Sequence, residues 1–377
     1  MFNVIILGLV SFLTDVSTEM VYPLLPLYLT LRLGASPAIV GLIEGVAESL
    51  ASLLKVFSGG ISDRLQRRKP LTILGYASST VGKLLLYLST SWAWVFWGRV
   101  IDRFGKGVRT APRDALIADS SHQEWRGRAF GLHRTLDTLG AAIGVILAYY
   151  FLTSYKGDYI AVFLYSLIPA SVAVALLFSV RERKAVTPLK TKNISLRWTS
   201  LNPRLKAFLA VTFLFTLGNS SNQFLLLRAK ERGFEPSMVI LLYLLYNIVY
   251  ALVSYPAGEL SDKVGRKALL VSGYVFYGLV YLGFAFAAGP SSLWVLFASY
   301  GLYIGLTEGV EKALVTDIAP QELRATLIGL HATLVGIGLF PASLLAGLLW
   351  DIFGPAAPFY FGGAMGLMAA FALWLIL

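Results

Sequence analysis

Apolar stretches of about twenty residues follow one another along this chain, separated by short polar, glycine- or proline-containing segments. An α-helix of that length crosses the hydrocarbon core of a bilayer. Only helices and closed barrels satisfy their own backbone in lipid, and barrel strands would alternate apolar and polar residues. Segments 271–288 and 335–349 are continuously apolar instead. The pattern therefore predicts an all-α polytopic membrane protein.

We expect twelve transmembrane helices. Their approximate limits are residues 4–30, 38–58, 70–90, 92–113, 128–153, 159–180, 205–227, 237–257, 268–288, 293–315, 325–350 and 356–377. Only 14% of the residues are charged, against about a quarter in soluble domains, so the chain is not solvated on all sides. The absence of cysteine excludes disulfides, thiolate chemistry and Cys-ligated metals.

The net charge of +11 is concentrated in alternate loops. Basic residues cluster in segments 63–69, 181–206 and 262–267, after the second, sixth and eighth expected spans. The positive-inside rule predicts that these loops and both termini are cytoplasmic and that the protein is a multi-pass protein of the cell membrane. Segment 228–232 is basic on the opposite side, but three loops outweigh it. This distribution argues for a lipid bilayer as partner and against nucleic acid.

Two blocks of sequence recur at nearly one offset. Segment 115–133 resembles 313–331 at an offset of 198 residues, and segment 59–64 resembles 258–263 at an offset of 199. Six spans per half is an even number, so the halves run parallel about an axis along the membrane normal. We expect an N-terminal six-helix bundle over 1–180, a cytoplasmic linker over 181–204 and a C-terminal six-helix bundle over 205–377.

Segment 258–267 reads Gly-Glu-Leu-Ser-Asp-Lys-Val-Gly-Arg-Lys and resembles the cytoplasmic loop signature of the major facilitator superfamily (MFS). A first copy occupies 59–68 and departs from the signature at Gln66, where the family has glycine. Segment 97–107 is similar to the basic motif on the fourth span of that family, with a higher density of charge. The resemblance implies the MFS fold, with two pseudo-symmetric bundles and alternating access by a rocker-switch movement.

The loop signature also implies a gating latch between the two halves. Gly59 and Gly258 would allow close helix approach, as small residues do in membranes. Asp63 and Asp262 would each accept hydrogen bonds from a helix N-terminus of the other half. The alternative is that the basic residues of the loop only follow the positive-inside rule, and that Arg109 and Arg113 only snorkel, extending their charged ends to the membrane surface. The predicted latch comprises Gly59, Asp63, Arg64, Arg109, Arg113, Gly258, Asp262, Lys263 and Arg266.

The fourth span carries an unusual charged face. Six ionisable residues recur there at intervals of three or four, so they share one side of the helix: Arg99, Asp102, Arg103, Lys106, Arg109 and Arg113. Charge inside a bilayer costs several kcal/mol unless it is paired or hydrated. We therefore expect Arg99, Asp102 and Arg103 to line a cavity.

Further polar residues of the spans could share that cavity: Asp15, Glu19, Glu44, Glu48, Lys106, Arg134, Asp137, Asn219, Asn222, Glu308 and Glu311. In the resembled family spans 1, 4, 7 and 10 surround the pathway, so Asp15 and Glu19 could meet the arginines. The acids Asp15, Glu19, Glu44 and Glu48 either carry a coupling proton or form static ion pairs. The amides of span 7 either bind substrate or bond to a neighbouring helix. His133 and His331 are expected to pack rather than relay protons.

These observations predict a secondary active transporter, a monomer that couples proton movement to export of a small organic or drug-like solute. An anionic metabolite bound by the arginines of span 4 is the alternative, with or without proton coupling. Enzyme motifs such as a nucleophile elbow or a phosphate loop do not occur, and no cofactor is expected. The proline that accompanies antiport in the family is missing from segment 139–144, although Gly140 and Gly144 still allow close helix contact.

Overall fold

A computed structural model of the chain describes residues 2–65, 67–121, 125–182, 202–287, 289–319 and 324–376, except for the side chains of 63–65 and 324–325. Within these ranges every regular element is a helix. The predicted all-α membrane fold of twelve spans is confirmed, with the first and seventh spans interrupted. Most of the predicted linker, residues 183–201, lies outside the described ranges.

The first six spans begin with an interrupted helix. Its regular part is α1 (Phe2–Val21), and short irregular turns follow: a 3-10 turn (Tyr22–Leu24), α2 (Leu25–Leu27) and a π-helical turn (Tyr28–Arg32). The proline at position 23 and the one at 26 cannot donate a backbone hydrogen bond, which accounts for the departure from α-geometry. The other helices are α3 (Pro37–Leu65), α4 (Arg68–Tyr87), α5 (Trp92–Asp119), α6 (Arg126–Ser154) and α7 (Tyr159–Leu177).

The last six spans contain one broken helix. The seventh span consists of α8 (Pro203–Gly218) and α9 (Gln223–Glu231), with residues 219–222 outside any regular helix. The remaining helices are α10 (Pro236–Val264), α11 (Arg266–Phe286), α12 (Pro290–Ile318), α13 (Arg324–Phe353) and α14 (Ala357–Ile376).

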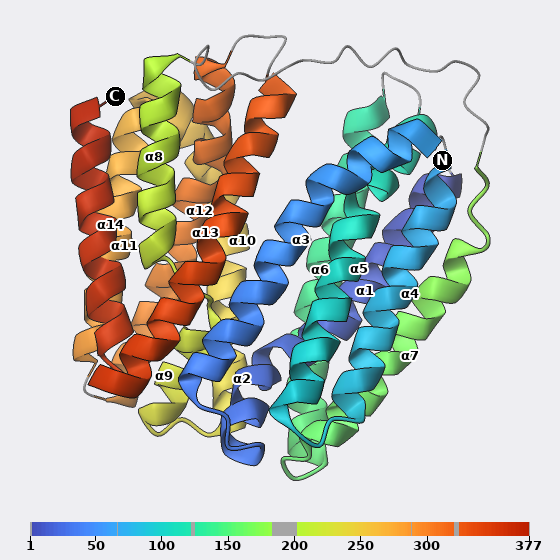
Figure 1. Ribbon diagram of the computed structural model, residues 1–377, viewed down its shortest axis with the longest axis horizontal. Helices are drawn as coiled ribbons and strands as arrows, with labels where there is room; N and C mark the ends of the chain where they lie inside the picture. Colours follow the sequence, from blue (N-terminus) through green and yellow to red (C-terminus); the bar gives the residue numbers. More distant parts are fainter. Residues whose placement is uncertain are drawn as a thin grey trace. The chain divides into compact units, whose positions relative to one another are not determined.

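The chain forms two compact units. The first unit holds residues 1–35 and 46–192, and the second unit holds 36–45 and 193–377, so the first turns of α3 group with the second unit. In the first unit α1 packs on α6 and α7, and α4 packs on α5 and α7. In the second unit α8 packs on α13 and α14, and α11 packs on α12 and α14 (Figure 1). The helices α8 and α11 therefore pack in the second unit as α1 and α4 pack in the first, so the sequence repeat is also a structural repeat.

The two units differ in how apolar their helices are. By length and composition alone, eight described helices could cross a membrane: α1 with its continuation, α6 and α7, and then α10 to α14. Three of them belong to the first unit and five to the second. In the first unit α5 falls short because of its charged face, and in the second unit α8 is only 16 residues long. Polar chemistry is thus concentrated in the helices of the first unit.

Small residues bring neighbouring helices of the first unit into backbone contact. A Cβ atom added to Gly82 of α4 would lie 2.5 Å from the Gly98 carbonyl oxygen of α5, and one added to Gly105 would lie 2.3 Å from that of Gly75. On the other side of the unit, α6 approaches α1 at Gly140 and Gly144, where an added Cβ would meet the α1 backbone at 2.4 and 2.5 Å. The close contact predicted for these two glycines is confirmed.

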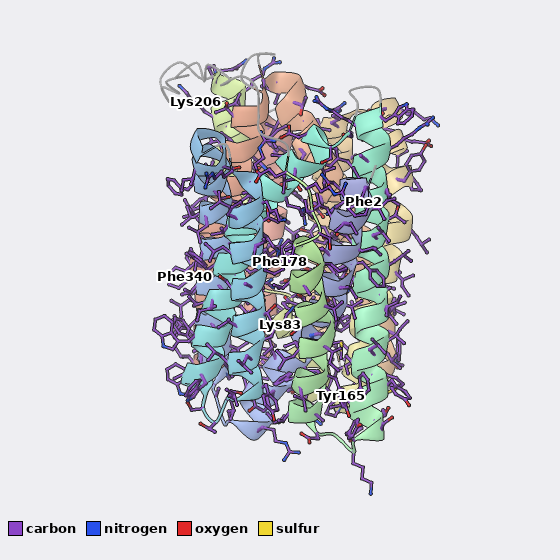
Figure 2. The ribbon with its side chains drawn as sticks, turned by 90° about the vertical axis from the view of Figure 1, so that its right-hand side faces the viewer. Phe2, Lys83, Tyr165, Phe178, Lys206 and Phe340 are labelled. Atoms are coloured by element: carbon purple, nitrogen blue, oxygen red, sulfur yellow. The ribbon has the colours of Figure 1, made fainter. Side chains whose placement is uncertain are left out.

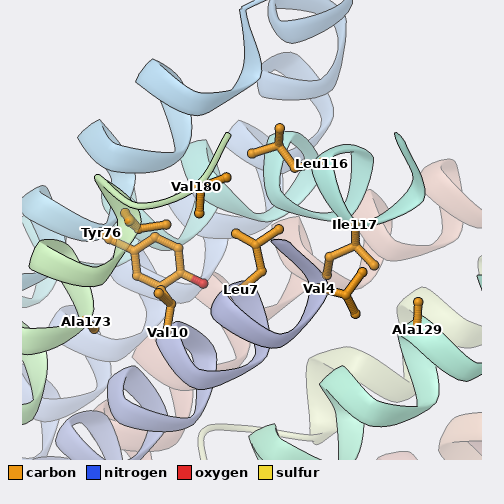
Figure 3. Packing of buried hydrophobic residues seen from close by; sticks show 10 residues of the cluster. Val4, Leu7, Val10, Tyr76, Leu116, Ile117, Ala129, Ala173 and Val180 are labelled. Carbon is orange, nitrogen blue, oxygen red and sulfur yellow. The ribbon is translucent and has the colours of Figure 1, made fainter. Parts of the chain in front are cut away.

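An apolar cluster closes one end of the first unit. Val4, Leu7 and Val10 of α1 pack against α5 and α7, with the Tyr76 ring of α4 beside them (Figure 3). The members are at most 3% exposed. Because α1, α4, α5 and α7 meet in this cluster, it fixes the rotation of α5 and hence the direction in which its charged face points.

One residue of the basic segment 228–232, which opposed the positive-inside pattern, has a structural role. The Arg228 side chain of α9 is fully buried, and its Nε and Nη2 donate to the carbonyl oxygens of Phe284 and Ala285 at 3.0 and 2.8 Å. Those carbonyls belong to the last turn of α11, where a helix favours a cation. Glu231 balances the charge, with its Oε2 2.8 Å from Nη1. Arg228 therefore stabilises the fold and carries no information on topology.

Candidate functional site

The charged face of α5 is buried within the first unit. Arg99, Asp102 and Arg103 are 2–4% exposed, and Arg109 is 6% exposed. Lys106 is the exposed member of the face. The glycine contacts between α4 and α5 account for this burial, because they bring the two backbones close around Asp102. Arg99, Asp102 and Arg103 therefore lie together on the buried side of α5, and the expectation that they line a cavity stays a prediction.

Two carboxylates organise the arginines. Glu48 of α3 lies 2.8 Å from Arg103 Nε and 3.8 Å from Arg99 Nη2. Asp102 Oδ2 lies 3.3 Å from Arg99 Nη1 and 3.5 Å from Arg103 Nη1. The four side chains therefore form one ionic network between α3 and α5. A buried network of this kind repays its desolvation only when its members are well paired.

A fifth charge that sequence reasoning missed belongs to the same unit. Lys83 of α4 is 2% exposed, and its Nζ donates to Thr18 Oγ1 of α1 at 3.0 Å. Figure 2 shows it between the two ends of the helical bundle. The sequence signal was a single lysine inside the apolar run 70–87. A charged residue within a span indicates a functional site there just as the charges of α5 do.

Arg109 and Arg113 do not simply extend to the end of the helix. Arg109 is buried, donates from Nη1 to Ser79 Oγ and stacks over the Tyr76 ring at 4.5 Å. Arg113 donates to Ser11 Oγ at 3.2 Å and pairs with Asp114 at 2.8 Å. The snorkelling interpretation is therefore wrong for Arg109, whose guanidinium packs between helices.

Asp15 of α1 occupies a different position from the one expected. It forms no ion pair with Arg99 or Arg103, which are held by Glu48 and Asp102. Its electrostatic partners are the carboxylates of Asp137 and Glu19 and the guanidinium groups of Arg109 and Arg113. Within the described ranges no hydrogen bond or ion pair reaches the Asp15 carboxylate. Asp15 is thus a partly buried acid without a direct partner.

Three other predicted residues of the first six spans, Asp137, Arg134 and Glu44, lie in different surroundings. Asp137 approaches His133, with Oδ2 3.5 Å from Nδ1, so this pair adjoins Asp15. Arg134 is exposed and forms no ion pair with the described residues, so the structure does not bring it into the cluster. Glu44 is buried at 1% exposure on α3, in the segment 36–45 that belongs to the second unit.

In the second unit the predicted amides meet tyrosines. Asn219 Nδ2 donates to the Tyr303 hydroxyl at 3.2 Å. Asn222 accepts from the Tyr300 hydroxyl at 2.6 Å and donates to that of Tyr246 at 3.3 Å. Sequence reasoning singled out the amides but missed the tyrosines. The available signal was their helical spacing: Tyr274, Tyr277 and Tyr281, then Tyr300 and Tyr303.

The acids of α12 are paired within the second unit. Glu308 accepts from the Tyr250 hydroxyl at 2.6 Å and from Lys312 at 2.8 Å. Glu311 accepts from the Tyr274 hydroxyl at 2.9 Å and lies 3.6 Å from His331 Nε2. No group of three His, Asp or Glu residues in the described ranges could hold a metal ion.

The loop signature contributes an ion pair at the same repeat position in each unit. Arg68 pairs with Asp119 in the first unit, and Arg266 pairs with Asp317 at 2.9 Å in the second. Arg266 follows Arg68 by 198 residues, and Asp317 follows Asp119 by the same offset, so the two pairs are equivalent in the repeat. In the sequence, Asp119 and Asp317 belong to the repeated segments 115–133 and 313–331 and were not predicted as latch residues. The structure adds them to the candidate latch.

The other latch residues remain outside these pairs. Asp262 is exposed and lies 3.6 Å from Arg266, and Lys263 is exposed beside it. The side chains of Asp63 and Arg64 lie outside the described part of the chain. Close helix approach at the signature glycines is not found within either unit. A Cβ at Gly59 would make ordinary contact with Ala111 at 3.5 Å, and one at Gly258 would meet nothing within 4 Å.

Known proteins share both the sequence pattern and the fold. The family model of the Major Facilitator Superfamily matches residues 7–227 and 207–377. An uncharacterised MFS-type transporter of Methanocaldococcus jannaschii is 39% identical over 381 residues, which cover 99% of this chain and 94% of the relative. The multidrug resistance protein MdtH of Escherichia coli O157:H7 is 23% identical over 370 residues, or 94% and 89% of the two chains.

Solved structures show the same architecture at low identity. The nucleoside transporter NupG aligns with a TM-score of 0.82 at 14% identity, covering 100% of this chain and 99% of that one. A D-xylose–proton symporter aligns with a TM-score of 0.76 at 17% identity, covering 99% and 97%. The repeated signature, the twice-repeated helix packing and these matches lead to one conclusion. The chain is a multi-pass membrane transporter that belongs to the Major Facilitator Superfamily.

Proposed function

We propose that this transporter couples proton movement to the export of a small organic, drug-like compound by alternating access. The observation that carries the proposal is the Asp15 carboxylate, which lies within a membrane-spanning helix and has no hydrogen-bond or ion-pair partner in the described part of the chain. A charged carboxylate is costly inside a bilayer, and protonation removes most of that cost. The distant likeness to a multidrug resistance protein supports the choice of an exported, drug-like substrate.

Coupling arises if protonation of Asp15 changes the balance between conformations. The charged form repels Asp137 and Glu19 and attracts Arg109 and Arg113. Protonation removes these forces together, so the relative energy of two arrangements of α1 and α5 changes with the bound proton. The paired acids Glu48 and Asp102 are held by arginines and serve as structural counter-ions in this scheme.

We place both termini and the basic loops on the cytoplasmic side of the cell membrane, because the remaining basic loops follow the positive-inside rule. The structural role of the buried Arg228 accounts for one of the three basic residues that oppose this rule in segment 228–232. Residues 1–180 and 205–377 then form the two moving halves of a monomer. The pairs Arg68–Asp119 and Arg266–Asp317 brace the loops that form the gating latch.

A second candidate, transport of an anionic metabolite, is supported by the composition of the buried network. Lys83, Arg99 and Arg103 are all at most 4% exposed. Asp102 and Glu48 neutralise part of this positive charge, and guanidinium groups suit the geometry of a phosphate or carboxylate group on an anion.

Proteoliposomes with an internal pH dye test the first proposal. With chloramphenicol as an uncharged drug-like probe, we expect wild-type protein to move protons when the probe is added, and Asp15→Asn to abolish this signal. Asp158→Asn is the matched control, because Asp158 caps α7 through Ile160 N and asparagine caps helices equally well. Proton movement at the wild-type rate in Asp15→Asn would remove Asp15 from the coupling mechanism.

The same preparation decides between the two candidates. If the protein carries an anion, sulfate should raise the melting temperature of wild-type protein and have no effect on Lys83→Met. A sulfate effect that survives in Lys83→Met would show that the buried lysine takes no part in anion binding. No effect of sulfate on wild type, together with proton movement driven by the uncharged probe, would leave drug-like export as the function.

A further inference from the structure

The break in the seventh span is built into the second unit. The helix α8 ends at Gly218, and the carbonyl oxygen of that residue accepts from the Tyr277 hydroxyl of α11 at 2.8 Å. The Ser221 backbone N–H donates to Ser343 Oγ of α13 at 3.1 Å. Side chains from neighbouring helices therefore replace the hydrogen bonds that a continuous helix would have made.

The amides of the break are held just as firmly. Asn219 bonds to Tyr303 of α12, and Asn222 bonds to Tyr300 of α12 and Tyr246 of α10. Three neighbouring helices and α13 thus fix the irregular segment. Irregular backbone that the surroundings hold this strongly is typical of sites where substrate or ions bind in transporters of this architecture.

One amide in this region stands out because it is not satisfied. Gln223 is fully buried, at 0% exposure, yet neither its Nε2 nor its Oε1 has a hydrogen-bond partner in the described part of the chain. Its backbone N–H is engaged by Ser221 Oγ at 3.3 Å, so the side chain alone is free. A buried amide in a native protein is nearly always paired, with protein, water or ligand. Gln223 therefore presents one unused donor beside one unused acceptor.

The surroundings restrict which group could pair with it. The rings of Tyr277 and Tyr281 lie 4.2 Å apart, and Tyr281 and Tyr300 lie 6.1 Å apart, so the region is lined with aromatic surface. The charged residue nearest to it along α9, Arg228, is already engaged by Glu231 and by backbone carbonyls. A charged ligand would lose its hydration there without gaining a counter-ion.

We propose that Gln223 is a substrate-binding residue that recognises an uncharged planar group with an adjacent donor and acceptor, such as a lactam or a carboxamide. The amide of Gln223 forms two parallel hydrogen bonds with such an edge, and the tyrosine rings contact its faces. Asn219 and Asn222, which are partly exposed, form the approach to the buried amide. This inference rests on the proposed function, because it names the chemical class of the organic solute.

A matched pair of probes tests the proposal on the purified full chain in detergent. The first probe, 2-pyridone, has the donor–acceptor edge, and N-methyl-2-pyridone has the same ring with the donor blocked. By ligand-observed NMR titration we expect 2-pyridone to bind at least about tenfold more tightly, because the methylated probe leaves the Gln223 acceptor unpaired. Gln223→Leu should abolish the difference. Asn247→Leu, which removes an amide bonded only to Tyr243 O on its own helix, should keep it.

Equal binding of the two pyridones to wild-type protein, or no binding of either, would overturn the proposal and leave Gln223 as the site of a buried water. Survival of the tenfold difference in Gln223→Leu would overturn it as well. If Gln223→Leu does not elute as a monodisperse protein, the nearly isosteric Gln223→Met, which also lacks the amide donor and acceptor, gives the same test. Proton movement by wild-type proteoliposomes is measured separately, so the inference can fail while the proposed transport stands.

Discussion

The two units place different chemistry at equivalent positions of one repeated scaffold. At the offset of 198 residues, Lys83 corresponds to Tyr281, Asp102 to Tyr300, and Arg99 to Phe297. All six side chains are at most 3% exposed. The equivalent helix pairs, α4 with α5 and α11 with α12, therefore carry buried ionic side chains in one unit and buried aromatic side chains in the other.

The difference shows what each network requires. Phenols and amides can be buried at modest cost, because each needs only one or two hydrogen bonds. Buried charges need full pairing, and the loss of one partner leaves the other charge buried without its counter-ion. The second unit is thus expected to tolerate single substitutions at its aromatic positions, whereas the first unit should respond strongly. The following substitutions test this contrast.

The largest effect is expected at Asp102. Replacement by alanine removes a carboxylate that pairs with both Arg99 and Arg103, which are buried. We expect Asp102→Ala to lower the free energy of unfolding by about 3–5 kcal/mol, as loss of one partner of a buried ion pair does elsewhere. Denaturant titration in detergent measures this value. The contrast between the units fails if Asp102→Ala costs no more than Tyr300→Phe at the equivalent position.

A smaller effect is expected at Arg228, the fully buried cation of the second unit. Arg228→Met removes the two hydrogen bonds to the last turn of α11 and leaves Glu231 without this partner. The expected loss is about 2–3 kcal/mol. Lys230→Met on the same helix is the matched control and should change stability by less than about 0.5 kcal/mol. Equal effects of the two substitutions would show that Arg228 does not stabilise the end of α11.

The smallest effect is expected at Tyr277. Tyr277→Phe keeps the ring but leaves the Gly218 carbonyl oxygen without the hydroxyl that closes the break. We expect a loss of about 1 kcal/mol, typical of one neutral hydrogen bond. The same unfolding titration serves, with Phe284→Leu as a packing control on α11. A loss as large as that of Asp102→Ala would mean that the break, and not the ionic network, is the sensitive part of the molecule.

Residues of the charged face illustrate how far sequence reasoning reached. The spacing of Arg99, Asp102 and Arg103 correctly predicted one shared helix face, because helical periodicity is a local property of the chain. The partner of these arginines was not predictable. Asp15 and Glu48 were both plausible from sequence, and only the packing of α3 against α5 selected Glu48.

The sequence by itself determined the membrane-spanning helices, the internal repeat and the family, because hydropathy, spacing and offset are all written along the chain. The tertiary structure alone decided which side chains meet. Close contact at Gly82 and Gly98 sets the rotation of α5, and that rotation buries Asp102 and Lys83 in one unit. The physical reason is that helix rotation depends on interdigitation of many weak contacts across helices, a sum that no local pattern contains.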